Sequence, residues 1–364
     1  MKILIGVCGI GKGHCIRQYE ICKALINRGH EVRVLTYLEG INFFEKTDIK
    51  FYKVFVPLVL YKGDKLDIFN CLRRNFCVFI PGLIKNRKVM RSLFKEGFIP
   101  DVCISDYEPI VAKISYKLKK PLLNIDQQSK FIYMDKEIIH GFSCVEEKKR
   151  LNLFFPKYNN KYIVSFYNLK NINLPQNVEV LYPIIAEDIR NKQLQIKTKN
   201  KIIVYFSKFI DIPIRQTYVE VINIFENINN FEFVIFSTEL YGEKMNIGKN
   251  IKIYKNEREK FIEELLEAKG VISTAGHTLI SESFYLGKPV FVLPLPTFDQ
   301  HYCAKIILEN DLGYAADKIT ITNLKNFLLK LNLYSYNIAK STELIEKKDT
   351  LNYLIKKIEE FKKE

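Results

Sequence analysis

The stretch GIGKGHCIR (residues 9–17) places three glycines directly before a histidine, after a short apolar run that predicts a buried strand. Glycine permits tight turns, and an imidazole can take a proton from a hydroxyl group at neutral pH. The dinucleotide pattern G-x-G-x-x-G fails here because His14 stands where the third glycine is required, and no Gly-Lys-Ser/Thr follows to make a P-loop. The stretch therefore predicts a glycine-rich turn that opens a helix, with the candidate residues Gly11, Gly13, His14 and Arg17.

A second candidate site lies in STAGHTLISES (residues 273–283), where a strand over 270–274 runs into a turn and then a helix. Gly276 allows the backbone to turn tightly and a ligand to approach the main chain. The first N–H groups of a helix carry partial positive charge, which predicts a diphosphate site at Gly276, His277 and Thr278. One turn further on, Glu282 could accept hydrogen bonds from both hydroxyls of a ribose; alternatively, it is a surface residue of the helix.

A third group of polar residues follows the apolar run PVFVLP (residues 289–294). Asp299 and Gln300 stand where that predicted strand gives way to a helix, and ligands of open α/β sheets bind at the carboxyl ends of strands. A carboxylate beside an amide offers the acceptors and donors that sugar hydroxyls need. An Asp-Gln pair is also a common way to begin a helix.

Strand and helix patterns alternate twice along the chain and must position these residues. Apolar runs over 2–7, 31–37, 100–106 and 121–126, with a helix over 15–28, predict a first βα series. A second series begins at residue 201 and includes strands over 231–237, 250–255, 270–274 and 289–294. The polar segment between the series predicts a linker. We therefore expect a first domain over 1–185, a linker over 186–200, a second domain over 201–345, and a C-terminal helix over 346–364 that packs back on the first domain.

The order of TAGHTLISES, LGKPV and PTFDQHYCA resembles the nucleotide-sugar half of GT-B glycosyltransferases, notably the UDP-glycosyltransferase superfamily and the lipid-II GlcNAc transferase. The N-terminal GIGKGHCIR, SDYEP (105–109) and NIDQQ (124–128) are more similar to uncharacterised prokaryotic GT-B proteins. The resemblance implies an α/β fold with two Rossmann-like, doubly wound parallel-sheet domains that face each other across a cleft. It also implies that the first domain binds the acceptor and the second binds the nucleotide sugar. The His-Cys-Gly-Trp box of the plant enzymes is absent.

The resemblance also implies roles for the candidate residues. Gly276, His277 and Thr278 would hold the diphosphate, Glu282 the ribose, and Asp299 with Gln300 the donor sugar. Ser207 would meet the diphosphate from the other side, and Phe261 would stack on the base or, alternatively, belong to the core. His14 would be the general base of an inverting transfer, with Asp106 orienting it or acting as base itself, and Gly11, Gly13 and Arg17 would form the acceptor loop. The helix dipole would stabilise the leaving group, so no metal and no cofactor besides the nucleotide sugar is expected.

Net charge is the unusual feature of the composition: 56 Lys and Arg against 41 Asp and Glu give +15. This favours an anionic partner, or else reflects a biased composition. Residues 73–95 hold seven Lys or Arg and no Asp or Glu among apolar residues, which predicts either contact with an anionic membrane or lipid-phosphate acceptor, or a solvated helix. No basic tail or RNA-type aromatic run is present, which argues against nucleic acid.

The chain shows no signal peptide, no apolar run long enough to span a bilayer, and eight cysteines without CxxC spacing. We therefore expect a cytoplasmic protein, at most peripheral to the inner face of the membrane. The leading interpretation is an inverting, metal-independent glycosyltransferase that moves a sugar from a nucleotide sugar, UDP-linked, to a glycan, lipid-linked or small-molecule acceptor. The alternatives are a sugar-nucleotide 2-epimerase of the same fold, a DNA-modifying glucosyltransferase or a non-catalytic nucleic-acid binder.

Overall fold

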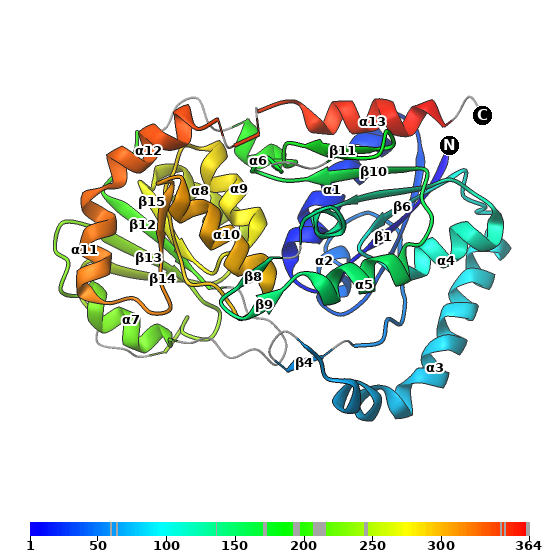
Figure 1. Cartoon of the computed structure of the whole chain (residues 1–364), viewed down its shortest axis with the longest axis horizontal. Helices are drawn as coiled ribbons and strands as arrows, with labels where there is room; N and C mark the ends of the chain where they lie inside the picture. Colours follow the sequence, from blue (N-terminus) through cyan, green and yellow to red (C-terminus); the bar gives the residue numbers. More distant parts are fainter. Residues whose placement is uncertain are drawn as a thin grey trace. The chain divides into compact units, whose positions relative to one another are not determined.

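The structure, a computed structural model, describes all residues except 59, 63–64, 136, 170–172, 192–196, 207–215, 244–246, 343, 346 and 362–364. The chain divides into two compact units (Figure 1). Unit 1 comprises residues 1–184 and 345–364, and unit 2 comprises residues 185–344. The segment that the sequence predicts as a linker holds a short helix, α6 (Glu187–Arg190), which belongs to unit 2.

Unit 1 is built on a seven-stranded parallel sheet in the order β11-β10-β7-β6-β1-β2-β3. Its strands are β1 (Lys2–Val7), β2 (Glu31–Thr36), β3 (Phe51–Lys53), β6 (Val102–Asp106), β7 (Leu122–Asp126), β10 (Asn160–Val164) and β11 (Val178–Leu181). The central strands are continuously buried, as expected for a parallel sheet covered on both faces. The strand order reverses between β1 and β6, so a crevice for a ligand is expected where these two strands end.

The helices of unit 1 are α1 (Lys12–Asn27), α2 (Glu39–Phe44), α3 (Ile68–Lys95), α4 (Pro109–Leu118), α5 (Val145–Phe154) and α13 (Thr350–Glu360), with the 3₁₀ helix η1 (Gln128–Ile132). Two antiparallel pairs, β4 (Tyr61–Lys62) with β5 (Lys65–Leu66) and β8 (Ile138–Ile139) with β9 (Phe142–Ser143), complete it.

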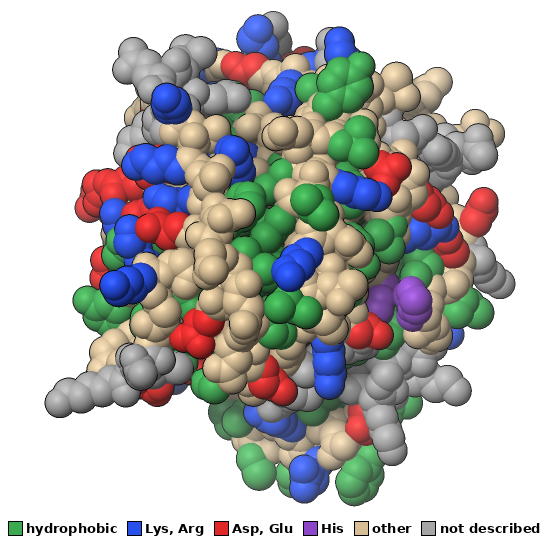
Figure 2. Space-filling model, turned by 90° about the vertical axis from the view of Figure 1, so that its left-hand side faces the viewer, with side chains coloured by type: hydrophobic (Ala, Val, Ile, Leu, Met, Phe, Trp, Pro, Cys, Tyr) green, Lys and Arg blue, Asp and Glu red, His purple; other side chains and the backbone are tan. Residues whose placement is uncertain are grey.

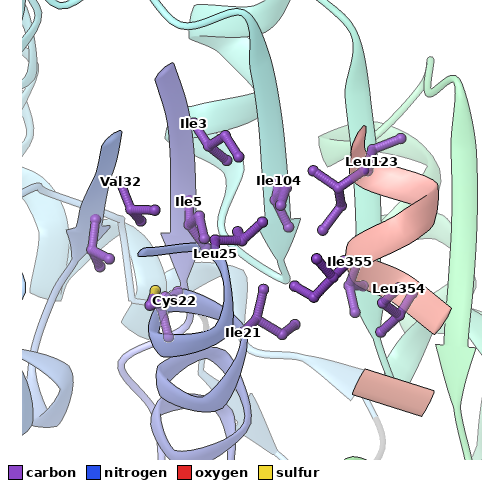
Figure 3. Packing of buried hydrophobic residues seen from close by; sticks show 14 of the residues in the cluster. Ile3, Ile5, Ile21, Cys22, Leu25, Val32, Ile104, Leu123, Leu354 and Ile355 are labelled. Carbon is purple, nitrogen blue, oxygen red and sulfur yellow. The ribbon is translucent and has the colours of Figure 1, made fainter. Parts of the chain in front are cut away.

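Helices α1 and α13 share one face of the unit 1 sheet (Figure 3). Ile21 and Leu25 of α1 meet Leu354 and Ile355 of α13 over the strands, and all four side chains are fully buried. Glu359 adds ion pairs of 3.0 Å to Arg28 and to His30. Helix α13 is therefore part of the core of unit 1.

Unit 2 is built on a six-stranded parallel sheet in the order β14-β13-β12-β15-β16-β17. Its strands are β12 (Lys201–Tyr205), β13 (Glu232–Phe236), β14 (Ile251–Tyr254), β15 (Gly270–Ser273), β16 (Val290–Val292) and β17 (Gly313–Ala315). Its longer helices are α7 (Tyr218–Phe225), α8 (Arg258–Glu267), α9 (His277–Tyr285), α10 (Phe298–Glu309), α11 (Ile321–Leu329) and α12 (Leu331–Lys340). The predicted α/β class with two Rossmann-like parallel-sheet units is confirmed.

Basic and acidic side chains lie interspersed over the face in Figure 2, at the end of Figure 1 that carries α7 and α11. This face does not form an area of one sign, despite the net charge of +15.

Candidate active site

The glycine-rich loop joins β1 to α1 at the reversal of strand order in unit 1. Gly9 is required by space, because a Cβ at this position would stand 1.6 Å from the carbonyl oxygen of Tyr37. Gly11 caps α1 with φ 79°, a left-handed conformation that favours glycine. Helix α1 therefore begins at Lys12, three residues before the predicted start, and His14 lies in its first turn with Gly13.

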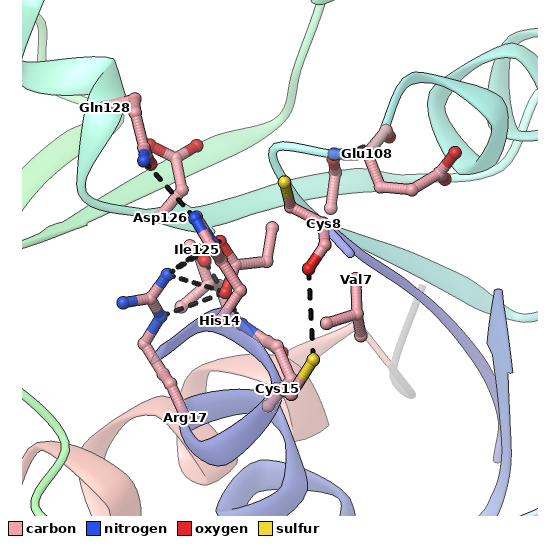
Figure 4. A network of polar contacts seen from close by, with 12 residues as sticks. Val7, Cys8, His14, Cys15, Arg17, Glu108, Ile125, Asp126 and Gln128 are labelled. Carbon is pink, nitrogen blue, oxygen red and sulfur yellow. Dashed lines mark hydrogen bonds and ion pairs between the residues drawn. The ribbon is translucent and has the colours of Figure 1, made fainter. Parts of the chain in front are cut away.

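His14 forms a close pair with Asp106, the last residue of β6. Its Nδ1 lies 2.7 Å from Oδ1 of Asp106. Its Nε2 lies 3.4 Å from Nε2 of Gln128 in η1 (Figure 4). Asp106 is fully buried, whereas 12% of the His14 side chain is exposed. Assigning the imidazole proton to Nδ1, facing the carboxylate, leaves the lone pair on Nε2. This tautomer also suits the amide group of Gln128, which would donate to Nε2.

Arg17 and Gln18 hold Asp106 from the next turn of α1. Arg17 donates from Nε at 2.9 Å and from Nη2 at 2.7 Å, and Gln18 donates from Nε2 at 2.9 Å. Burial alone would raise the pKa of Asp106, but the charges and hydrogen bonds of Arg17 and His14 lower it to about 2. An anion held this firmly is suited to orient His14 and is a poor base itself.

Arg17 does not belong to an acceptor loop, contrary to the sequence-based expectation. It lies in the second turn of α1, is 6% exposed, and is committed to Asp106. Arg17 stands three residues after His14, so both side chains lie on one face of the helix. This spacing could have indicated from the sequence that they share a partner. Gln18 and Gln128 are further members of the network that sequence reasoning did not assign, although Gln128 lies in the NIDQQ motif.

In unit 2, α9 begins directly after the turn at the end of β15, beside the reversal between β12 and β15. No side chain caps this helix, whereas threonines cap α7, α10 and α11. An uncapped N-terminus leaves its partial positive charge for an anion. His277 is buried and Thr278 is half-buried in this first turn. The backbone turns tightly here, because the N–H of Gly276 donates to the carbonyl oxygen of Thr274 at 2.7 Å. Gly276 has φ −74°, which any residue adopts, so this turn does not require glycine at that position.

The carboxylate of Glu282, predicted to hold a ribose, is bound by Arg258 at the start of α8. Oε1 of Glu282 accepts from Nη2 at 2.8 Å, and Asp188 of α6 accepts from Nε of the same guanidinium at 2.9 Å. Burial lowers the pKa of Arg258, but the two carboxylates outweigh it and raise that pKa above its usual value. Sequence reasoning missed this network, since nothing in the spacing of Asp188, Arg258 and Glu282 marks them as partners.

Asp299 and Gln300 lie in the first turn of α10, which Thr297 caps. Asp299 is half-buried, and Gln300 is 2% exposed. The side-chain oxygen of Gln300 accepts from the backbone N–H of Leu295 at 2.9 Å. Within the described part of the chain, the buried amide nitrogen of Gln300 has no hydrogen-bond partner. A buried donor left in this state suits a ligand hydroxyl.

Phe261 and Ser207 were also expected to contact the nucleotide-sugar donor, and the structure does not place either of them in that role. Phe261 of α8 is 7% exposed and packs edge-on against Tyr205 and Phe236, with ring centroids 5.8 and 5.0 Å away. Its ring is therefore part of the core, which corrects the expectation that it stacks on the base. Ser207 lies outside the described residues.

A family model described as Glycosyl transferase family 1 matches residues 1–332. The chain belongs to glycosyl transferase family 1. Within the described ranges, no three His, Cys, Asp or Glu side chains gather as metal ligands would. In the same ranges no helix combines the length and apolar character needed to cross a bilayer.

Two relatives are similar to this chain over most of its length. A UDP-N-acetylglucosamine--N-acetylmuramyl-(pentapeptide) pyrophosphoryl-undecaprenol N-acetylglucosamine transferase of Rickettsia felis is 25% identical over 349 residues, 88% of each chain. An uncharacterized glycosyltransferase of Methanosarcina acetivorans is 25% identical over 333 residues, 86% of this chain and 84% of its own.

Solved structures agree with this family at the level of the fold. The spinosyn rhamnosyltransferase SpnG complexed with thymidine diphosphate has a TM-score of 0.68 at 14% identity, over 99% of this chain and all of its own. The glycosyltransferase SnogD of Streptomyces nogalater has a TM-score of 0.63 at 14% identity, over 99% of both chains. The protein is thus a glycosyltransferase with a GT-B fold.

Proposed function

We propose that this enzyme transfers a sugar from a nucleoside diphosphate donor, UDP-linked, to an acceptor hydroxyl with inversion and without a metal. The pair of His14 and Asp106 carries the proposal, because a partly exposed imidazole bound to a buried carboxylate is the arrangement of a general base. The uridine diphosphate donor is supported by the name of the Rickettsia relative, and thymidine diphosphate in SpnG supports a nucleoside diphosphate more broadly.

The proton moves first to the imidazole. The acceptor hydroxyl displaces the amide of Gln128 from Nε2 of His14, and Nε2 then takes the hydroxyl proton while the Nδ1 proton remains hydrogen-bonded to Asp106. Asp106 stabilises the resulting imidazolium and stays ionised, because Arg17 holds its pKa near 2. The acceptor oxygen then bonds to the anomeric carbon from the face opposite the diphosphate, and the bond from that carbon to the diphosphate oxygen breaks.

The leaving nucleoside diphosphate carries away the electron pair and its negative charge. The uncapped N-terminus of α9, at Gly276, His277 and Thr278, stabilises this charge through backbone N–H groups and the helix dipole. Glu282 accepts the ribose hydroxyls, and Asp299 with Gln300 binds the donor sugar. The unpartnered amide nitrogen of Gln300 supports that last assignment among the described residues.

His14→Asn tests the general base, with His140→Asn as the matched control. His140 is an exposed histidine with φ 49°, a conformation that asparagine tolerates. We expect His14→Asn to lower turnover about 10²–10⁴-fold, the usual contribution of a general base, and to leave the thermal shift induced by UDP unchanged. His140→Asn should keep wild-type turnover. Wild-type turnover in His14→Asn would exclude the assignment.

Product analysis tests the rest of the reaction. NMR of the product should show the anomeric configuration inverted, and EDTA should leave the rate unchanged. Release of one UDP per transferred sugar separates this reaction from epimerisation, which forms no glycoside. A retained configuration or a rate abolished by EDTA would contradict the proposed mechanism.

The acceptor that we favour is lipid-linked, with the reaction at the cytoplasmic face of a membrane. The name of the Rickettsia relative includes a pyrophosphoryl-undecaprenol acceptor, and the basic segment 73–95 is compatible with an anionic surface. Small-molecule and glycan acceptors are the alternatives that an acceptor screen would separate.

A further inference from the structure

Helix α3 of unit 1 exposes an unusual amount of apolar surface. Phe76 is 81% exposed and Phe69 is 75% exposed, and large apolar residues continue along the same helix. The exposed apolar side chains of α3 are those of Ile68, Phe69, Leu72, Phe76, Val78, Phe79, Ile80, Leu83 and Ile84. Single exposed apolar residues are ordinary, but a contiguous set marks an interaction surface.

Helical periodicity places most of these side chains on one face. Ile68, Leu72, Phe76, Phe79, Ile80 and Leu83 follow the spacing i, i+4, i+8, i+11, i+12 and i+15, which defines a single stripe. We call this stripe the apolar face of α3. The helix also carries seven basic residues and no acidic one, namely Arg73, Arg74, Lys85, Arg87, Lys88, Arg91 and Lys95.

Polar contacts hold α3 to its own unit along one edge of this stripe, because Asn75 and Asn86 stand 7 and 18 residues after Ile68. The side chain of Asn75 accepts from the backbone N–H of Leu58 at 2.9 Å and donates to its carbonyl oxygen at 2.8 Å. Asn86 does the same with Phe55, at 2.7 and 2.8 Å. Between them Gly82 packs so closely on the Phe55 ring that a Cβ would stand 2.1 Å from it. A surface helix normally buries its apolar stripe. Helix α3 is anchored along one edge of the stripe, where Phe79 packs edge-on against Phe55 with ring centroids 6.4 Å apart, and the other large apolar side chains stay exposed.

We propose that α3 docks on an anionic lipid surface, with its apolar face between the headgroups and its basic residues at the phosphates. The role of this surface, delivery of a lipid-linked acceptor, rests on the proposed function. A membrane is the occupant that satisfies both features: apolar side chains enter the acyl boundary while Lys and Arg snorkel to the anionic headgroups. A second copy of α3 would bring like charges together, and a nucleic acid would leave the apolar face in water.

The experiment is co-sedimentation of the full chain with vesicles of equal parts phosphatidylglycerol and phosphatidylcholine, compared with pure phosphatidylcholine. We expect binding to the anionic vesicles that weakens as salt rises. Replacing Phe69, Phe76 and Ile80 by Gln should lower the partition coefficient at least 100-fold, since each buried side chain contributes about tenfold. Replacing Arg87, Lys88 and Arg91 by Glu should lower it by a similar factor.

Matched controls lie on α11 and its flanks in unit 2. Leu329→Gln removes a side chain that is 84% exposed, and Lys318, Lys325 and Lys330 are exposed lysines for a triple change to Glu. Both controls should bind vesicles as the wild type does, apart from a small, uniform effect of net charge. Equal losses in the control and α3 triple-Glu variants would show that only net charge matters and would overturn the proposal.

A second readout needs no variant. Cys77 on α3 is an exposed free thiol, and anionic vesicles should slow its alkylation by iodoacetamide several-fold while phosphatidylcholine vesicles do not. Unchanged alkylation, absent vesicle binding, or a dimer that vesicles do not dissociate would each overturn docking. The UDP-induced thermal shift is measured on every variant. If UDP causes no thermal shift in the wild type, the donor proposal alone is refuted. If UDP causes the shift but the wild type does not bind vesicles, docking alone is refuted.

Discussion

Replacing Asp106 by Asn tests whether the buried network around His14 is an ion pair that the fold depends on. The substitution keeps the size of the side chain and removes its charge. It turns an acceptor-only carboxylate into a group with two N–H donors, facing the donors of Arg17 and Gln18. Arg17, which is 6% exposed, would then be a buried cation with its counter-charge removed.

The magnitude follows from the pKa of Asp106, which the folded chain lowers from 3.8 to about 2. Because one unit is worth about 1.4 kcal/mol, the folded state favours the charged carboxylate by about 2 kcal/mol. This stabilisation is fully present above pH 3.8 and is lost as the pH falls through 2. Removing one partner of a buried pair costs about 3–5 kcal/mol, since the other charge stays buried. We therefore expect Asp106→Asn to lower the free energy of unfolding by about 3–5 kcal/mol at pH 7.

Urea unfolding followed by circular dichroism measures this loss, with the exposed Asp135→Asn as a control that should change stability by less than about 0.5 kcal/mol. The double variant Arg17→Met with Asp106→Asn should be more stable than Asp106→Asn alone, because it removes the unpaired cation. Two results would refute the ion-pair reasoning. One is an Asp106→Asn variant as stable as the wild type; the other is a double variant whose loss of stability equals the sum of the losses of the two single variants.

Two further substitutions probe other buried charges. Glu108 is fully buried, and burial outweighs its hydrogen bonds from Val111 and Ile110 to raise its pKa from 4.5 to about 7. The wild type should therefore lose about 3 kcal/mol of stability from this group as the pH rises from 4.5 to 7, and urea titrations of Glu108→Gln should lack that slope; a parallel pH profile would contradict the burial argument. Arg258→Gln removes the guanidinium that orients Glu282, so calorimetry should show UDP binding weakened about tenfold, with partial recovery in Arg258→Lys. Unchanged UDP affinity would separate Glu282 from the donor site.

The fold was accessible from sequence because parallel strands buried on both faces read as short apolar runs, such as KIIVY in β12 and VCISD in β6. The position of His14 could also be predicted, because β1 reads as a short apolar run and the glycines after it mark a turn. The hydrogen-bond partners of the site residues could not be predicted from the sequence. Arg17 meets Asp106 across 89 residues, and Arg258 meets Glu282 across 24, and no local pattern encodes such distances.

The orientation of side chains could not be predicted from the sequence either. Phe261 stands at the start of a helix near a strand end, where either a base or the core could take its ring, and only packing against Tyr205 and Phe236 decides. On α3 the apolar periodicity normally predicts the buried side of a helix. On α3, Asn75 and Asn86 anchor the helix through the backbone of Leu58 and Phe55, contacts that no local pattern marks, and most of the large apolar side chains stay exposed.

Because α13 packs in the core of unit 1 beside α1, unit 1 is built from both ends of the chain. Unit 2 is one continuous segment, residues 185–344, inserted between them. Exchange of unit 2 between relatives therefore requires two junctions in the chain and must keep residues 345–364 together with residues 1–184 of the same protein. A chimera joined at a single crossover would pair α1 with a foreign C-terminal helix, so Leu354, Ile355 and Ile358 would have to be grafted with it.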